Sequence, residues 1–227
     1  MQVVKGQLVP LEDLVYFPQT DFKLELHGQR DRCLVQDVLE GPEERARWVG
    51  LVLLKHGPRQ PGGRPPAVYP GGTAGRIVRY EERPDGRTEL LLHGEFRFEL
   101  AREIPGEPYR QAVVRPIEEP LWNEADAGIV LVKRALSALA QALFAELGGT
   151  SPLPAGELDG LARGSGFEAL VNRIAAELNL PALRKLALLS ESLPDRALSL
   201  LAILHDRLKL VEELKPFRRL AATSALN

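Results

Sequence analysis

The residues of this chain that could do covalent chemistry are one cysteine and four histidines. Cys33 follows Arg32, with Arg30 nearby, and neighbouring guanidinium groups could stabilise a thiolate. We favour the alternative that the thiol is a half-buried apolar group on a short helix. His27 and His93 each precede a glycine at the predicted end of a strand, where we expect ordinary turn or edge roles. We therefore predict no catalytic residue among them.

The signatures of nucleotide, zinc and serine-hydrolase sites are absent from the sequence. No glycine is followed by lysine, so the phosphate-binding loop G-x-x-x-x-G-K-[ST] is missing. There is no H-E-x-x-H pair, and one cysteine with four scattered histidines lacks the spacing of a metal cluster. Gly164-Ser165-Gly166 resembles a nucleophile turn but lacks the preceding strand, so we interpret Ser165 as a helix cap. We predict no cofactor, no metal and no enzymatic activity.

The remaining charged residues favour a solvated surface. Glu81-Glu82 and Glu118-Glu119 are adjacent, so on a strand the two carboxylates of each pair would point to opposite faces, a poor geometry for acid/base catalysis. Several arginines are interleaved with acidic residues, which is typical of a mixed-charge surface, although an RNA-binding edge stays open as an alternative. These arginines are Arg76, Arg79, Arg83, Arg87 and Arg97.

Composition sets further bounds. The 227 residues include 44% hydrophobic and 26% charged residues, close to globular averages. The formal net charge of −2 and the pI near 6.1 argue against a dominant attraction to nucleic acid or anionic lipid. A single cysteine fits a reducing compartment, and no apolar run approaches the roughly 20 residues that span a bilayer. We expect a cytoplasmic protein.

The predicted strands and helices that would hold any site fall into two groups along the chain. The first group predicts a sheet domain over residues 1–120. Residues 8–11 and 22–26 favour strands on either side of a turn at Phe17-Pro18, and residues 30–39 a short helix. The apolar run 48–54 predicts a central strand that is covered on both faces, and residues 109–117 could close the sheet.

A β-hairpin is the most specific local signal. Asp85-Gly86 lies between two alternating runs, and this pair favours a two-residue type I′ turn. Gly94 interrupts the second run, as in a bulged or sharply bent strand. In contrast, residues 56–72 are rich in Pro and Gly and predict a long loop, either a surface insertion or a partner-binding lid.

After Trp122 the spacing of leucines becomes helical, which predicts a bundle over residues 121–227. Asn123 is the expected N-cap of a first helix of about 24 residues that ends at Gly148-Gly149. Further helices should begin near Ser165, at Pro181 and at Ser192. The fold class is therefore α+β, with a bent sheet or barrel followed by a helical bundle.

The order of several short motifs resembles the amino-terminal, substrate-binding domain of the Lon protease family. The motifs are Pro10-Leu11, Phe17-Pro18, Leu24-x-Leu26, Arg30-x-Arg32, Val49-Gly50-Leu51-Val52, Gly72-Thr73-Ala74-x-x-Ile77, Asp85-Gly86-Arg87, Gly94-x-x-Arg97-Phe98, and, in the helical half, Leu183 to Leu189 with Arg196. The chain looks like a stand-alone protein of this type, since the ATPase and Ser-Lys peptidase motifs are absent. The resemblance implies a PUA-like β-barrel with a helical extension. It implies no catalytic or ligand residue.

The resemblance further implies a non-enzymatic protein-binding module for unfolded, apolar or degron-bearing polypeptide, and we expect no membrane partner. Two alternatives remain open. PUA-like sheets elsewhere bind RNA, which the acidic pI opposes, and a Lon-like domain lies beside a ligand-binding domain in cereblon, which leaves a small-ligand pocket as the third reading. The sequence leaves the oligomeric state and the specific partner open.

Overall fold

The structure is a computed structural model that describes residues 4–41, 48–56, 66–85, 87–106, 108–147, 160 and 166–224. The chain divides into two compact units. The first, which we call the sheet unit, comprises Met1–Pro120 and Leu178–Glu191. The second, the helical unit, comprises Leu121–Glu177 and Ser192–Asn227. The leucine spacing predicts a bundle over residues 121–227, whereas the compact sheet unit also includes residues 178–191.

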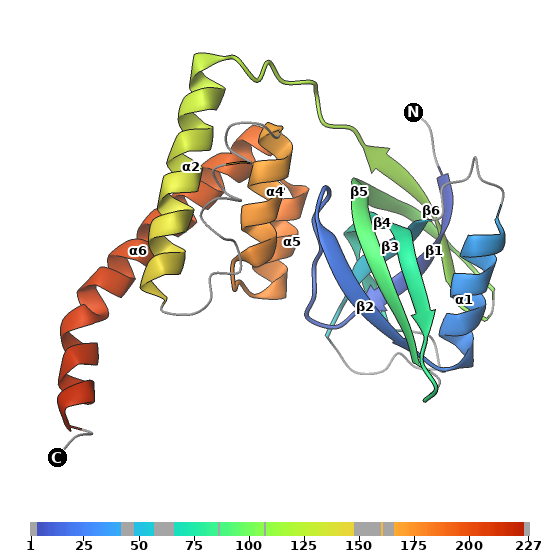
Figure 1. The fold of residues 1–227 in the computed structure, drawn as a ribbon. Coiled ribbons are helices and arrows are strands. Elements are labelled where there is room, and N and C mark those ends of the chain that lie inside the picture. Colours follow the sequence, from blue (N-terminus) through green and yellow to red (C-terminus); the bar gives the residue numbers. More distant parts are fainter. Residues whose placement is uncertain are drawn as a thin grey trace. The chain divides into compact units, whose positions relative to one another are not determined.

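The sheet unit is a mixed sheet that closes on itself (Figure 1). Its strands are β1 (Val4–Leu11), β2 (Asp21–His27), β3 (Trp48–Leu54), β4 (Val68–Glu82), β5 (Arg87–Ile104) and β6 (Arg110–Ile117). The strand order is β2-β5-β4-β3-β1-β6, and β5 also pairs with β6, so all strands except β2 form a closed ring. Only β1 and β3 are parallel among the described pairs. The α+β class and the closure of the sheet by residues 109–117 are confirmed.

Strand β3 is buried on both faces, as its apolar run predicts. Val49 and Leu51 join a core cluster that also contains the buried side of helix α1 (Gln29–Glu40). Trp48 and Val52 join a second cluster on the other face. Because side chains alternate along a strand, one seven-residue segment contributes to both cores.

The Phe98 ring lies against two glycines of the sequence motifs and leaves little room for a side chain at either position. Its ring is 1% exposed, and a Cβ atom at Gly72 would lie 2.7 Å from Phe98 Cζ and 2.5 Å from the Leu51 carbonyl oxygen. A Cβ atom at Gly50 would lie 3.1 Å from the same Cζ. The ring therefore fills the space that the missing side chains leave, which couples β3, β4 and β5.

Gly94 receives the turn at Phe17-Pro18. The Gly94 amide donates to the Thr20 carbonyl (2.9 Å), and the Gln19 amide donates to the Gly94 carbonyl (2.7 Å). A Cβ atom at position 94 would lie 2.4 Å from the Phe17 carbonyl oxygen. The β4–β5 register shifts beside Gly94, so the predicted bulge is confirmed, and its cause is this close backbone approach.

Two expectations for the β4–β5 hairpin are wrong. The Arg83 amide donates to the Arg87 carbonyl, so three residues lie between the bonded pair instead of two, and Gly86 lies outside the described residues. Residues 68–72 belong to β4 and not to a loop. Pro70 is tolerated because the β3–β4 register shifts opposite it, where no ladder hydrogen bond is required from its nitrogen. Residues 57–65 of the expected loop are not described.

The helical unit contains α2 (Ala127–Glu146), α4 (Phe167–Glu177) and α6 (Leu193–Ser224). Asp126, and not Asn123, caps α2: its Oδ1 accepts from the Gly128 and Ile129 amides at 2.8 and 3.3 Å. Asn123 instead accepts from Ala125 within the preceding turn, so α2 starts later and is 20 residues long. The positions expected for Gly148-Gly149 and Gly164-Ser165 lie outside the described residues.

Helix α2 also corrects an expectation about membranes. By length and composition it could cross a bilayer, with a mean hydropathy of 1.5. One such helix is weak support for a membrane span, because a core helix passes the same test. Within the helical unit α2 contributes buried residues that include Lys133, Leu136 and Phe144, and the Lys133 ammonium pairs with Glu124 at 2.9 Å. Of the apolar stretch of α2, 33% is buried within the structure.

Helix α5 (Ala182–Ser190) packs on the sheet unit through Arg97. The Arg97 guanidinium donates to the Leu189 and Glu191 carbonyls at 2.9 and 2.7 Å and pairs with Glu119 at 2.7 Å. Arg97 is 6% exposed. It therefore satisfies the carbonyls at the end of α5, which explains why this segment leaves the bundle that its leucine spacing predicts.

Candidate functional site

The sheet unit has a groove of about 580 Å³ between α1 and the hairpin end of β4 and β5. We call it the α1–hairpin groove. One wall comes from α1 and the other from the two strands. Its lining residues are Gln29, Arg32, Cys33, Val35, Gln36, Leu39, Glu40, Tyr80, Glu82 and Thr88.

The groove exists because α1 covers only part of the hairpin. Leu34, Val35 and Val38 are buried against the sheet. On the strands, Tyr80 pairs with Leu90 and Glu82 with Thr88, and side chains of paired residues share a face. Leu90 is 1% exposed whereas Tyr80 is 49% exposed, so the face that is buried on β5 becomes an open wall on β4.

Thr88 lies at the base of this wall with an unsatisfied hydroxyl. The residue is 2% exposed, and its Oγ1 atom has no hydrogen-bond partner in the described part of the chain. Burial of a hydroxyl without a partner costs about 1–3 kcal/mol. A polar group that enters the groove could form the missing hydrogen bond.

Cys33 lines the same groove from α1. Its side chain is partly buried and packs against the core cluster under α1, so the expected role as a half-buried apolar residue is confirmed. Arg32, the residue before Cys33, is exposed, and Arg30 is exposed about one helical turn before Cys33. The groove thus combines apolar surface from Leu39 and Tyr80 with charged groups at its rim.

The opposite side of α1 is fixed by Tyr109, which donates a short hydrogen bond to Asp37. Burial of the phenol, followed by the hydrogen bond to Asp37, raises the pKa of Tyr109 to about 12. Tyr109 is 5% exposed, and it belongs to the core cluster that α1 completes. This contact holds the helix, and with it one wall of the groove, against the strands.

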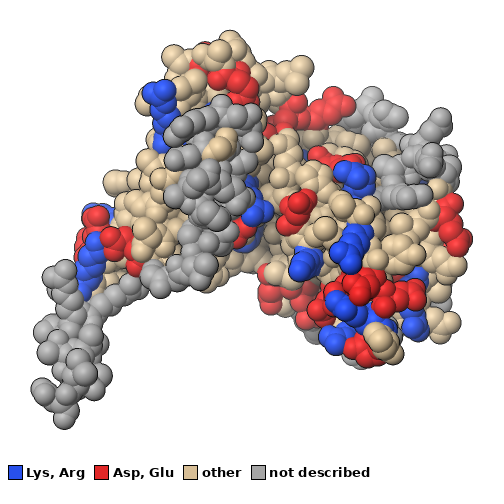
Figure 2. Space-filling view, viewed as in Figure 1, with Lys and Arg blue, Asp and Glu red and all other residues tan. Residues whose placement is uncertain are grey.

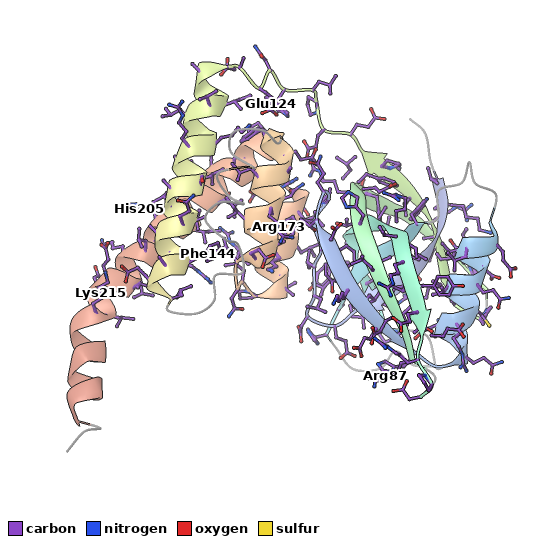
Figure 3. The ribbon with its side chains drawn as sticks, viewed as in Figure 1. Arg87, Glu124, Phe144, Arg173, His205 and Lys215 are labelled. Carbon is purple, nitrogen blue, oxygen red and sulfur yellow. The ribbon has the colours of Figure 1, made fainter. Side chains whose placement is uncertain are left out.

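The arginines of the hairpin are neutralised by neighbouring carboxylates. Distances from guanidinium nitrogen to carboxylate oxygen are short for Arg76 with Glu95 (2.6 Å), Arg83 with Glu89 (2.7 Å) and Arg87 with Asp85 (2.6 Å). Figure 2 shows the positive and negative side chains intermixed at this end of the sheet unit, and Figure 3 places Arg87 at the tip. Arg97, which the RNA-binding alternative also placed at this edge, is 6% exposed and so does not contribute to it.

The residues of the sequence motifs are dispersed over the sheet unit. Phe17, Pro18 and Gly94 meet in one turn, Gly72 and Phe98 pack together, and Arg97 anchors α5. Arg30 and Arg32 lie on α1, and Asp85 and Arg87 lie at the hairpin tip, where the Arg87 side chain also approaches Glu25 at 3.4 Å. Apart from Arg32, these residues do not line the groove. Their positions are those of a scaffold.

Sequence reasoning missed Tyr80, Leu39 and Thr88 as wall residues. Because side chains alternate between the two faces of a strand, the sequence predicts Thr88 on the same face as Leu90, and this pattern could have identified it as a wall residue. The groove itself depends on where α1 ends relative to the hairpin, which no local pattern specifies.

The histidines do not converge. His93 contacts Asp21 at 2.6 Å and His56 contacts Asp13 at 2.9 Å, both on exposed surface. Within the described ranges, no group of three or more His, Cys, Asp and Glu side chains could hold a metal ion.

Comparison with known proteins identifies a family. A family model described as the ATP-dependent protease La (LON) substrate-binding domain matches residues 7–222. The Lon protease of Flavobacterium johnsoniae is 25% identical over 207 residues, which cover 90% of this chain and 24% of that protein. The Lon protease of Dictyoglomus thermophilum is 31% identical over 112 residues, 49% of this chain and 13% of that protein. The chain thus spans about a quarter or less of these relatives.

Two solved structures share the fold. The N-terminal domain of Mycobacterium avium complex Lon protease has a TM-score of 0.64 at 16% identity and covers 91% of this chain and 98% of its own. A Lon N-terminal domain protein from Xanthomonas campestris has a TM-score of 0.62 at 22% identity and covers 88% and 98%. Both likenesses extend over the sheet and the helices.

Proposed function

The chain belongs to the family of the ATP-dependent protease La (LON) substrate-binding domain, and from this premise we propose that it binds unfolded or apolar polypeptide segments in the α1–hairpin groove, without catalysis. The observation that carries the proposal is the groove itself. It is an open, partly apolar depression on the sheet unit, and its volume of about 580 Å³ lies in the range typical of binding sites.

The lining of the groove supports a polypeptide ligand. Leu39 and Tyr80 offer apolar surface for side chains, whereas Arg32 and Glu82 offer charged groups of both signs at the rim. An unfolded segment presents apolar side chains together with backbone amides, so it can use both kinds of surface. Aromatic residues such as Tyr80 are enriched where proteins bind one another.

The proposal excludes catalysis by this chain because the family match is to the substrate-binding domain and the phosphate-binding loop of an ATPase is absent from the sequence. We further propose a cytoplasmic location, which fits the single cysteine.

The proposal predicts that Tyr80, an exposed aromatic residue in the groove, contributes more to polypeptide binding than an equally exposed leucine outside the groove. Tyr80→Glu should weaken binding of a reduced and alkylated, unfolded model protein by about tenfold, because it replaces apolar contact area with a charge. Leu14→Glu is the matched control, since Leu14 is 50% exposed, close to the 49% of Tyr80, and lies outside the groove. Fluorescence anisotropy of the labelled model protein provides the dissociation constants.

The native, folded form of the same model protein should not bind. If the folded wild-type chain binds neither form, or if both variants bind as the wild type does, the proposal is wrong.

A further inference from the structure

One edge of β4 that borders the α1–hairpin groove is not paired with any described strand. Strand β3 pairs with β4 only as far as Arg76, opposite Trp48. Beyond that point, β5 covers one edge of residues 77–82, and no strand in the described part of the chain covers the other. Among the described residues, this segment is therefore paired on one side.

The hairpin fixes which residues face the free edge. The Arg83 amide donates to the Arg87 carbonyl across the hairpin, so the backbone groups of Arg83 point toward β5. Backbone groups of successive residues in a strand point to opposite edges, and bonded and non-bonded pairs alternate along an antiparallel ladder. The N–H and C=O groups of Tyr80 and Glu82 consequently point away from β5, to the free edge.

The same two residues line the groove with their side chains. Backbone recognition groups and a binding surface for side chains are thus presented by one pair of residues, about 7 Å apart at the repeat of an extended chain. Strand β2 also has an edge that no described strand covers, but its inward residues Phe22, Leu24 and Leu26 are buried in the core. A second depression, of about 380 Å³, is lined by β2 together with β4 and β5, and most of its lining side chains are charged, so it offers little apolar surface to an added strand.

Thr88 provides a second, independent indication of a ligand. Its buried Oγ1 atom is unsatisfied and belongs to the lining of the groove, opposite Glu82 in the β4–β5 register. A donor or acceptor that enters beside Glu82 could reach it.

From these observations we propose that the α1–hairpin groove binds its polypeptide as an additional antiparallel strand on the free edge of β4, with hydrogen bonds to the backbone of Tyr80 and Glu82. This inference rests on the function proposed above and specifies the substrate class. The preferred ligand is an extended segment, free of proline at the bonded positions, with apolar residues at every second position. In antiparallel pairing, the ligand residues that bond to Tyr80 and Glu82 turn their side chains into the groove.

The geometry makes a test with backbone-modified peptides possible. The probe is an acetylated octapeptide in which valine alternates with threonine and lysine. N-methylation of the valines removes the donors that face β4, whereas N-methylation of the intervening residues removes donors that face away. The first peptide should bind at least about tenfold more weakly than the unmodified probe, because it loses hydrogen bonds to β4, and the second should bind as the probe does.

A pair of variants tests the same contact from the side of the protein. Glu82→Pro removes a donor that faces the free edge and leaves the β4–β5 ladder intact, and Glu82→Ala removes only the side chain. The proline variant should lose binding of the octapeptide relative to the alanine variant, with similar thermal unfolding of the two proteins.

The outcomes separate the two proposals. If the unmodified octapeptide binds and the two N-methylated peptides bind equally to each other, whether more weakly than the probe or as the probe does, strand addition is overturned. The groove would then remain a binding site without this mode of binding. If the octapeptide and the unfolded model protein both fail to bind the folded chain, the proposed function fails as well.

Discussion

Tyr109 joins the segment before β6 to helix α1 through its hydrogen bond to Asp37. Burial and this bond favour the neutral phenol and raise the pKa of Tyr109 to about 12, compared with 10.0 for an unperturbed tyrosine. Because the folded-state pKa is the higher one, the folded chain holds this proton more tightly than the unfolded chain. The associated stability is complete below pH 10 and is lost as the pH rises toward 12.

The pH dependence of unfolding tests this contact. In a Trp122→Phe background, Trp48 reports on the sheet unit, since it is 4% exposed in the core. The free energy of unfolding in urea should fall between pH 10 and about 12, and Tyr109→Phe should fall less over that range while being less stable at pH 8. Tyr16, whose pKa is also raised by burial, is present in both proteins and cancels in the comparison. Parallel pH curves for the two proteins would contradict the assignment.

Individual residues also show which structural roles the sequence could indicate and which it could not. The resemblance singled out Gly72, Gly94 and Phe98, and in the structure a backbone carbonyl or a ring lies close to each of the two glycines. Arg97 was singled out as well, but its partners are carbonyls about 90 residues away in the chain, at Leu189 and Glu191. No local pattern could indicate that pairing.

Among the elements of the sheet unit, strand β5 pairs with three other strands. It pairs with β2 through its first half, with β6 through its second, and with β4 along most of its length. The bulge beside Gly94 separates these halves. Strand β4 occupies one edge of β5, whereas β2 and β6 follow one another along the other edge, and the bulge lies between these two segments, where it bends the strand.

Substitution of Gly94 should therefore disturb more than a local turn. A Cβ atom at Gly94 would meet the Phe17 carbonyl oxygen at 2.4 Å, whereas at Gly71 the closest described atom, Leu186 Cδ1, lies at 3.5 Å. Gly94→Ala should destabilise the sheet unit by about 1–3 kcal/mol, as overpacking does, and Gly71→Ala by less than about 1 kcal/mol. Urea unfolding followed by Trp48 fluorescence measures both. Equal losses would show that the approach at Gly94 relaxes freely.

The elements were largely predictable, and their ends were not. Alternation and leucine spacing located every strand and helix described for the two units, with the exception of residues 68–72. The first residue of α2 was misplaced because Asn123 and Asp126 are both suitable caps, and only the geometry of the turn selects Asp126.

For the whole molecule, the chain passes from the sheet unit into the helical unit, returns with α5, and leaves again with α6. The sequence suggested one crossing at residue 120, since leucine spacing in α5 looks the same whether it packs on helices or on strands. Within the helical unit, Glu124 accepts hydrogen bonds from the Phe167 amide and from Lys133, and Figure 3 shows Glu124 near the start of α4. Burial raises the pKa of Glu124, but these bonds outweigh it, so the pKa lies below the usual value.

The groove is likewise a property of the whole sheet unit. It requires the hairpin, the end of α1 and the tie through Tyr109 to be in place together, which is why composition and motifs suggested a binding module without locating its surface. The fold class followed from local patterns, whereas the candidate site follows from how far one helix extends along two strands.

Hydrogen exchange of the full chain, with and without the unfolded model protein, shows which surface binds the polypeptide. We expect slower exchange of the Tyr80 and Glu82 amides and of α1 when the model protein is added, while amides of the helical unit keep their rates. Protection confined to the helical unit, with the hairpin and α1 unchanged, would contradict the assignment of the α1–hairpin groove as the polypeptide-binding site.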